Sequence, residues 1–143
     1  MKLSAKAEYA CVAMAELAAR HSRKLPTSLK TIADTYRISQ PFLMQIFLQL
    51  KGAKLVQSAR GAAGGYQLAR PPEEIALSDI VDAIDGPSGE SFALSSVPTA
   101  PLIRALLTIW GEVRRAERAV LDDMTLAGLV QLTREVGATD YQI

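Results

Sequence analysis

The segment Ser58–Pro72, SARGAAGGYQLARPP, combines residue types that could do chemistry: three glycines and two arginines lie between two short apolar runs. Glycine lets a backbone approach a ligand closely, and arginine pairs with phosphate groups. Such a segment is typical of two different sites. One is the phosphate-binding loop of a nucleotide-using enzyme, and the other is a hairpin that binds nucleic acid.

The glycine spacing argues against the enzyme. The stretch RGAAGGY has neither the G-x-G-x-x-G spacing nor the Gly-Lys-Ser/Thr ending of a phosphate loop. Both of those loops run into a helix, whereas a strand-like run and two prolines follow here. Cys11 and His21 are the only cysteine and histidine of the chain, so these residues form no catalytic pair and no metal site. We expect no enzymatic activity.

The charged residues divide the chain into a basic and an acidic part. Residues 1–70 hold eleven Lys and Arg against three Asp and Glu, a net charge of +8, whereas residues 71–143 have a net charge of −7. A basic surface gains affinity from every phosphate that it neutralises, so a polyanion such as double-stranded DNA is the expected partner. The alternative is a chance excess of solvated lysines.

The length and composition fit one packed unit: 143 residues with 49% hydrophobic content are enough for a single core. No run approaches the roughly 20 apolar residues of a membrane helix. Lys6, Glu8 and Glu16 interrupt the region where a signal peptide would be uniformly apolar. We therefore expect a cytoplasmic protein without a membrane partner.

Apolar residues recur at three- and four-residue spacing in the first half of the chain and predict three helices. Each helix follows a serine that can cap it: Ser4, Ser28 and Ser39. The first helix ends near Arg20, the second near Arg37 and the third near Gly52. Only a short turn separates the last two, which therefore form a helix-turn-helix.

After Gly52 the apolar period changes to about two, so residues 54–60 and 66–70 are predicted to be strands joined by GAAGG. We expect Gly64 and Gly65 to take positive φ angles in this reversal. Three helices followed by a hairpin are the elements of a winged helix-turn-helix. The predicted fold class is mainly α with a small β-hairpin wing.

The remaining chain is predicted to be helical around one loop. Ser78 with Asp79 starts a short helix that Gly86 closes, and residues 87–99 form a loop without apolar period. The longest helix is expected over residues 100–123. Thr125 caps a last helix that ends at Gly137. We divide the chain into a DNA-binding domain at 1–86, the loop at 87–99, and a dimerisation helix with a C-terminal helix at 100–143.

The long helix carries more apolar surface than one small domain can cover, so we expect it to pack against its copy in a homodimer. The expected interface residues are Leu102, Leu106, Ile109, Trp110, Val113 and Val120. An effector pocket that includes Trp110 is the alternative.

In a winged helix-turn-helix the third helix enters the major groove, while the wing lies along the backbone or reaches the minor groove. Glutamine suits paired hydrogen bonds with adenine, and basic residues suit phosphates or a narrow minor groove. The expected DNA-binding residues are Ser39, Gln40, Pro41 and Gln45 at base edges, Lys30, Arg37 and Lys51 at phosphates, Arg60 in the minor groove, and Ser28, Gly61, Gly64 and Gly65.

The run Ile38–Gly86, ISQPFLMQIFLQLKGAKLVQSARGAAGGYQLARPPEEIALSDIVDAIDG, resembles a bacterial repressor family. That family is typified by the iron-sulfur cluster regulator, the nitric-oxide-sensing repressor and the repressor of cysteine metabolism. KAEYACVAMAELA near the start, with LLTIWGEV and MTLAGLV near the end, extends the likeness over nearly the whole chain. The resemblance implies a homodimeric transcription factor on a pseudo-palindromic operator, contacting DNA at the recognition-helix positions given above and at Arg60.

The chain departs from this family at its cofactor. Many members hold an iron-sulfur cluster through three cysteines in the loop after the dipeptide that corresponds to Asp85 and Gly86. Here the segment from Pro87 to Arg104 contains no cysteine, and thiolates are the usual ligands of such clusters. Glu8 falls where some relatives supply a carboxylate ligand, but we interpret it as an acid of the first helical turn. We expect no cofactor and no metal.

We therefore expect a sequence-specific transcriptional regulator, a repressor, that acts as a homodimer without a cluster and responds to an effector of unknown class. The alternative is a protein-interaction regulator whose loop at 87–99 and acidic half bind a metabolic enzyme or another partner, with DNA binding secondary. Cys11 is interpreted as a small buried hydrophobe in preference to a redox switch.

Overall fold

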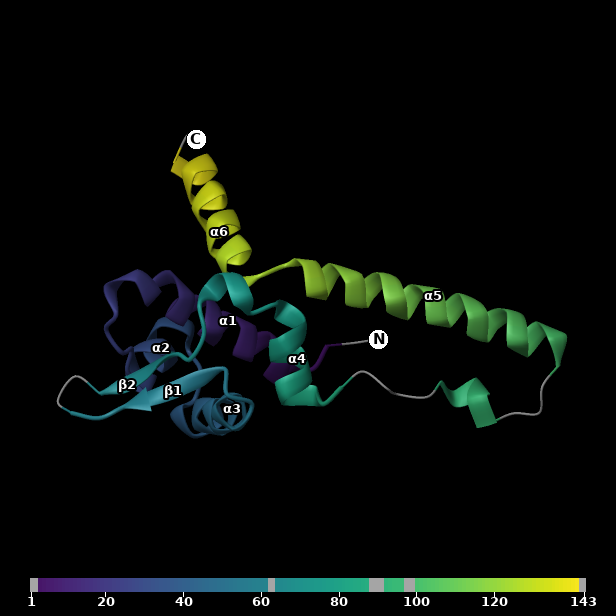
Figure 1. The fold of residues 1–143 in the computed structure, drawn as a ribbon, viewed down its shortest axis with the longest axis horizontal. Coiled ribbons are helices and arrows are strands. Elements are labelled where there is room, and N and C mark those ends of the chain that lie inside the picture. The colour runs from purple at the N-terminus through teal and green to yellow at the C-terminus, as the bar shows by residue number, and fades with distance from the viewer. Residues whose placement is uncertain (1–2, 62–63, 88–91, 97–99, 142–143) are drawn as a thin grey trace.

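The computed structural model describes residues 3–61, 64–87, 92–96 and 100–141. Its helices are α1 Ala5–Ala19, α2 Leu29–Tyr36, α3 Gln40–Gly52, α4 Leu77–Asp85, α5 Pro101–Asp123 and α6 Leu126–Tyr141. Strands β1 Val56–Ala59 and β2 Gly65–Leu68 form one hairpin, and short 3-10 turns lie at His21–Arg23, Pro72–Glu74 and Ala93–Ser96. In Figure 1, α1–α4 gather into one body from which α5 and α6 project in different directions.

Three serine caps set the starts of the first three helices, as the sequence predicts. The hydroxyl oxygens of Ser4, Ser28 and Ser39 accept hydrogen bonds from the backbone N–H groups three residues later, at 3.0, 3.1 and 3.3 Å. Arg37 takes a left-handed conformation with a φ of 54° and ends α2. Because only three residues, 37–39, lie between α2 and α3, these helices form the expected helix-turn-helix.

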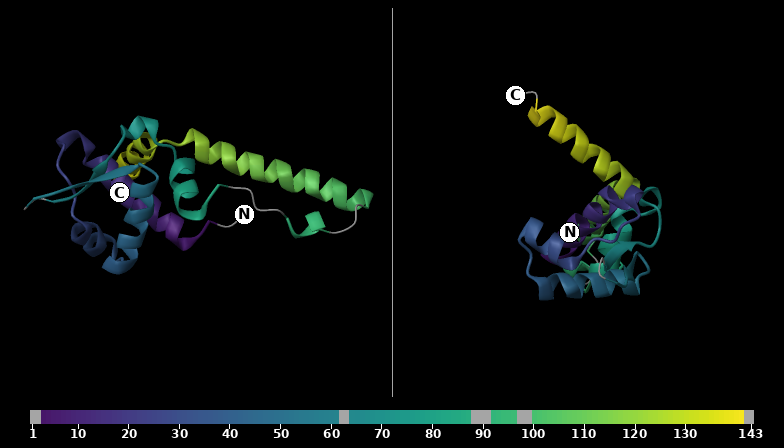
Figure 2. Two further views of the ribbon diagram at one scale, coloured as in Figure 1. Left: turned by 60° about the horizontal axis from the view of Figure 1, so that its bottom comes forward. Right: turned by 90° about the vertical axis from the view of Figure 1, so that its left-hand side faces the viewer.

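The hairpin is antiparallel, with Val56 opposite Leu68, and its strands are shorter than predicted. The prediction of positive φ angles at Gly64 and Gly65 is wrong. In the described part of the hairpin, Gly61 is the glycine with a positive φ angle, at 116°. Gly64 and Gly65 instead lie close to other backbone, since added Cβ atoms would come within 2.9 and 2.3 Å of carbonyl oxygens. Figure 2 shows the hairpin projecting from the body at the end remote from α5.

The start of α4 and the end of α6 differ from the predictions. Ala76 is the N-cap of α4, and Ser78 is buried inside the first turn at 3% exposure. Asp79 does support this start, because its carboxylate accepts a hydrogen bond from the Ala76 N–H at 2.9 Å. α6 continues past Gly137, which does not adopt the left-handed conformation of a helix stop. Glycine inside a helix costs about 1 kcal/mol relative to alanine, which a continuous helix tolerates.

The loop expected at 87–99 falls partly on residues 88–91 and 97–99, which lie outside the described residues. Within its described part, Ala93–Ser96 forms a 3-10 turn. The cap predicted at the start of α6 is confirmed, since the Thr125 hydroxyl accepts a hydrogen bond from the Gly128 N–H at 3.0 Å.

The core lies between α1, α2, α3, α4 and the first turn of α6. Its largest fully buried side chains are Phe47, Met14, Ile32, Leu43, Ile46, Leu50, Leu55, Ile75, Ile80 and Leu126. α5 contributes no residue to this core. The predicted fold class, a mainly helical winged helix-turn-helix with a hairpin wing, is confirmed. Among the described residues no helix is long and apolar enough to cross a membrane.

Candidate nucleic-acid interface

α3 buries one side and exposes the other. Leu43, Ile46 and Leu50 are fully buried on the inner side. At 100° per residue, the opposite side of the helix forms one continuous stripe. The exposed residues of this stripe are Gln40, Pro41, Met44, Gln45, Leu48 and Lys51, and the exposed cap Ser39 precedes them. The structure thus brings together the base-reading residues predicted on this helix and adds two apolar side chains to them.

Met44 and Leu48 are the members of this stripe that the sequence analysis missed. Their exposures are 42% and 58%, high for large apolar side chains. A helical projection of the sequence does contain the signal, because it sets Leu48 about 140–160° and Met44 about 100–120° from Leu43 and Leu50.

Tyr66 on β2 joins the wing to the helix-turn-helix. Its backbone N–H and C=O pair with the C=O and N–H of Thr27 at 2.9 and 3.0 Å, so a short bridge ties the wing to the residue before the α2 cap. The Tyr66 ring stacks on Phe47 of α3 with 4.5 Å between centroids. Its hydroxyl donates to the Met44 sulfur at 3.8 Å. The wing, the start of α2 and the recognition helix are therefore held in one fixed relation.

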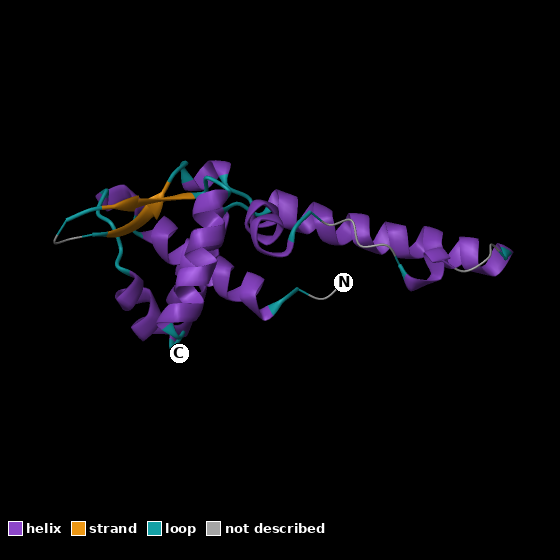
Figure 3. Ribbon diagram, turned by 90° about the horizontal axis from the view of Figure 1, so that it is seen from below, coloured by secondary structure: helices purple, strands orange, loops and turns teal. Residues whose placement is uncertain are grey.

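Gly65 permits this bridge. A Cβ at this position would lie 2.3 Å from the Thr27 carbonyl oxygen and 2.8 Å from the Ser28 nitrogen, distances that real Cβ atoms essentially never show. The glycine is needed because two backbone segments pass each other at this point. Figure 3 shows the hairpin in orange beside the helices of the body, on the side away from the long α5.

The basic residues predicted to contact phosphates differ in whether another side chain already binds their charged group. Arg37 and Arg60 are exposed and form no ion pair with any described residue. Lys51 donates to the Ser58 hydroxyl on β1 at 3.1 Å, which holds its ammonium group between α3 and the wing. Lys30 pairs with Asp34 at 2.6 Å, and this hydrogen bond raises the pKa of Lys30. The positive charge of Lys30 is therefore partly compensated by the Asp34 carboxylate.

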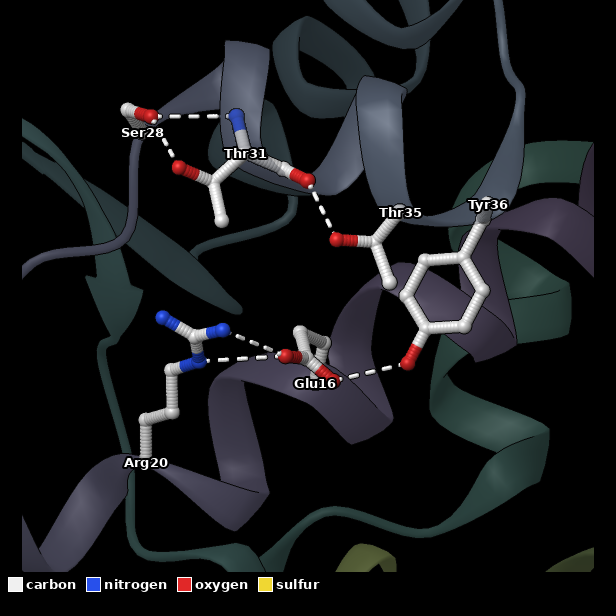
Figure 4. Close-up of polar contacts among 6 residues, drawn as sticks. All are labelled: Glu16, Arg20, Ser28, Thr31, Thr35 and Tyr36. Atoms are coloured by element: carbon white, nitrogen blue, oxygen red, sulfur yellow. Dashed lines mark hydrogen bonds and ion pairs between the residues drawn. The ribbon is translucent and has the colours of Figure 1, made fainter.

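Ser28, also predicted to contact DNA, is half-buried and uses its hydroxyl locally. It accepts from the Thr31 N–H and lies 2.7 Å from the Thr31 hydroxyl, while the Thr35 hydroxyl donates to the Thr31 carbonyl at 2.7 Å (Figure 4). These bonds fix the first turns of α2.

Glu16 of α1 links the helix-turn-helix to the body, a contact that sequence reasoning did not find. Its carboxylate accepts from the Tyr36 hydroxyl at 2.7 Å and from Arg20 Nε at 3.0 Å (Figure 4). Burial, with the bond to Glu16 second, raises the pKa of Tyr36 to about 12. The phenol is therefore a neutral donor at physiological pH, and it fixes the end of α2 against α1.

Most of the residues of α5 that are predicted for a dimer interface are exposed to solvent in the single chain. Leu102, Ile109, Val113 and Val120 are exposed, at 71%, 49%, 41% and 69%, whereas Leu106 and Trp110 are half-buried. α5 is anchored to α4 by Arg118, which donates to both carboxylate oxygens of Asp82 at 2.7 and 2.8 Å. Its orientation relative to the DNA-binding body is thus set by a paired contact, while four of its six predicted interface side chains are exposed to solvent.

The single thiol is held in its protonated form. Cys11 lies half-buried on α1, and burial, with the charge of Glu8 second, raises its pKa to about 11. A thiolate is the species that attacks and binds metals, so Cys11 is a poor ligand and a poor nucleophile at neutral pH. Across the described ranges, no three His, Cys, Asp or Glu side chains lie where they could hold a metal ion.

Comparison with known proteins agrees with this architecture. Residues 3–132 match the Rrf2 family, described as an iron-dependent transcriptional regulator. The chain is 40% identical over 133 residues to the HTH-type transcriptional regulator CymR of Bacillus subtilis, covering 93% of this chain and 92% of CymR. The structure of CymR, titled the global cysteine regulator of B. subtilis, matches with a TM-score of 0.81 at 39% identity, over 92% of this chain and 98% of CymR.

A second solved structure, T. potens IscR, matches with a TM-score of 0.77 at 34% identity, over 95% of this chain and 90% of IscR. The fold of this chain is therefore similar, over most of its length, to solved structures whose relatives include the HTH-type transcriptional regulator CymR. On this basis the chain belongs to the Rrf2 family and is a DNA-binding transcriptional regulator of the winged helix-turn-helix type.

Proposed function

We propose that this chain is a repressor that binds a pseudo-palindromic operator as a homodimer. In each protomer α3 enters the major groove, and the wing, with Arg60 at its root, follows the backbone into the adjacent minor groove. The observation that carries this proposal is the Tyr66 bridge, because it holds the exposed stripe of α3 and the wing as one rigid reading head. Repression is then steric, by occupation of the promoter.

The apolar side of α5 supports the dimer. The helix has 23 residues, a length of about 35 Å at 1.5 Å per residue. Its exposed apolar residues recur at helical spacing, and burying them against a second copy would remove them from water. A two-fold axis through such an interface would set the recognition helices about one turn of DNA apart, roughly 34 Å.

A cluster-free protein is part of the proposal, although the family is described as iron-dependent. Iron-sulfur clusters are held by thiolates, and the donor set of this chain does not supply them. The segment after α4 has no cysteine, and Cys11 is a half-buried thiol with a raised pKa. Protein purified without oxygen is expected to be colourless, and visible iron-sulfur absorbance with stoichiometric iron would refute this part.

The DNA function is tested by selecting binding sites from a random duplex pool and titrating the selected site at several salt concentrations. We expect a two-fold-symmetric sequence and an affinity that falls steeply with salt. Gln40→Ala with Arg60→Ala should weaken binding while the fold is kept, because both side chains are exposed. An unenriched pool, or an affinity indifferent to salt, would refute the proposal.

The dimer is tested by sedimentation at micromolar concentration. Ile109→Asp with Val113→Asp places two charges on the exposed side of α5 and should produce monomers, whereas Leu25→Ala, at an exposed leucine before α2, should leave dimers. A wild-type protein that sediments as a monomer would contradict the homodimer.

A further inference from the structure

The DNA-facing stripe of α3 has an apolar centre. Met44 and Leu48 lie one helical turn apart in it, and Pro41 lies one turn before Met44. All three are exposed. Pro41 and Leu48 are seven residues apart, about 10 Å along the helix, which corresponds to about three base-pair steps of 3.4 Å. The strip thus has the length of a short run of base edges.

Packing does not explain these side chains. The inner side of α3 is filled by Leu43, Ile46, Phe47 and Leu50, all fully buried. Core packing therefore does not require an apolar side chain at either exposed position. Met44 is also held in place, because the Tyr66 hydroxyl donates to its sulfur and the Tyr66 ring is stacked on Phe47. An exposed apolar side chain fixed by a neighbour is suited to a specific contact.

The surroundings of the strip indicate DNA as its occupant. Lys51 borders it on the same stripe, and Gln40 and Gln45 flank it with amide groups. The sequence of α3 contains no Asp or Glu. This combination of cationic and hydrogen-bonding groups around an apolar centre fits a major groove, where phosphates border the base edges. The apolar group that the major groove presents is the 5-methyl of thymine.

We infer that Met44 and Leu48, with Pro41, form a methyl-reading strip that contacts thymine 5-methyl groups in the operator. The strip selects thymine by apolar contact, alongside the hydrogen bonds of Gln40 and Gln45. This inference rests on the proposed DNA function and adds the chemical group that the recognition helix reads.

The test uses the selected operator with each thymine replaced in turn by deoxyuridine. This replacement keeps base pairing and every hydrogen-bonding group and removes only the methyl. Burial of one methyl-sized group contributes about 0.8 kcal/mol, so each contacted methyl is expected to account for a roughly fourfold change in affinity. We expect such losses at one or more thymines in each half-site and no change at thymines elsewhere.

Two variants link the effect to the strip. Met44→Ala and Leu48→Ala should each bind the thymine and deoxyuridine operators with nearly equal affinity at the position that the lost side chain contacts. Leu25→Ala is the matched control, because this leucine is 64% exposed, comparable with Leu48, and lies outside α3. It should retain the wild-type difference. Circular dichroism of the variants checks that α3 is still folded.

The outcomes separate this inference from the proposed function. If no specific site is selected, the DNA function and the strip fail together. If a specific site is selected but thymine and deoxyuridine bind equally throughout, the DNA function stands and the strip is refuted. A difference that persists unchanged in both Met44→Ala and Leu48→Ala also refutes it, because other residues then read the methyl groups.

Discussion

Replacing Gly65 by alanine tests how the wing is attached. The added Cβ would lie 2.3 Å from the Thr27 carbonyl oxygen, whereas ordinary contacts begin at 3.4 Å, so the two backbones would have to separate by about 1 Å. The contacting atoms belong to backbone and cannot rotate away as a flexible side chain could. The change therefore acts on the bridge between Thr27 and Tyr66.

The expected loss of stability follows from two routes of relaxation. If the clash remains, overpacking costs about 1–3 kcal/mol. If the segments separate, the two backbone hydrogen bonds between Thr27 and Tyr66 are lost, at about 1 kcal/mol each. Alanine restricts the unfolded chain more than glycine does, which offsets about 0.4–1 kcal/mol. We expect the free energy of unfolding to fall by about 1–2 kcal/mol.

The assay is urea unfolding at fixed protein concentration, together with affinity for the selected operator. Gly52→Ala is the matched control, because a Cβ there meets nothing within 4 Å and the residue lies in the last turn of α3. It should be neutral or stabilise the protein slightly. Gly65→Ala should also weaken DNA binding, since the wing and α2 shift relative to each other. If both variants unfold at the same urea concentration, the backbone approach does not explain Gly65.

Four further changes have defined outcomes. Arg60→Ala should lower the slope of log affinity against log salt by about 1, and an unchanged slope would mean that Arg60 contacts no phosphate. Ser39→Ala removes the cap of α3 and should lower the free energy of unfolding by about 1 kcal/mol. A urea midpoint at the wild-type value would contradict this role of the cap. Cys11 ionises near its ordinary pKa of 9.0 when unfolded and near 11 when folded, so its contribution to stability should fall as pH rises through this interval; Cys11→Ala should remove that fall. In an absorbance titration one tyrosine should ionise at about pH 12, and the step should be missing in Tyr36→Phe.

Local chemistry explains which parts of the fold were predictable. Ser4, Ser28 and Ser39 act on amides three residues away, so a short window of sequence contains the whole interaction. Ser78 shows the limit of the same rule. Its hydroxyl type suggests a cap, but the backbone pairing of Leu77 with Met124 at 2.9 Å starts α4 earlier and buries Ser78.

The features that sequence reasoning missed depend on distant contacts. Gly65 looks like a turn residue, but a glycine is needed there because the backbone of Thr27, almost forty positions earlier, passes too close for a Cβ atom. Tyr66 looks like a strand aromatic, and only the assembled fold shows that it contacts both α3 and the connection before α2. Met44 is not among the residues predicted to contact DNA, because composition does not say which apolar residues of α3 the core has room for.

The Tyr66 bridge also bears on protein engineering. Wings are attractive modules for transplanting DNA preferences between regulators, because they are short and contiguous in sequence. Here the graft would have to include partners outside the hairpin: Thr27, which pairs with its backbone, and Phe47, which supports its ring. A hairpin exchanged alone would lack these two contacts, which fix its position relative to the helices. The transferable unit in this protein is therefore the wing together with the connection before α2 and the inner side of α3.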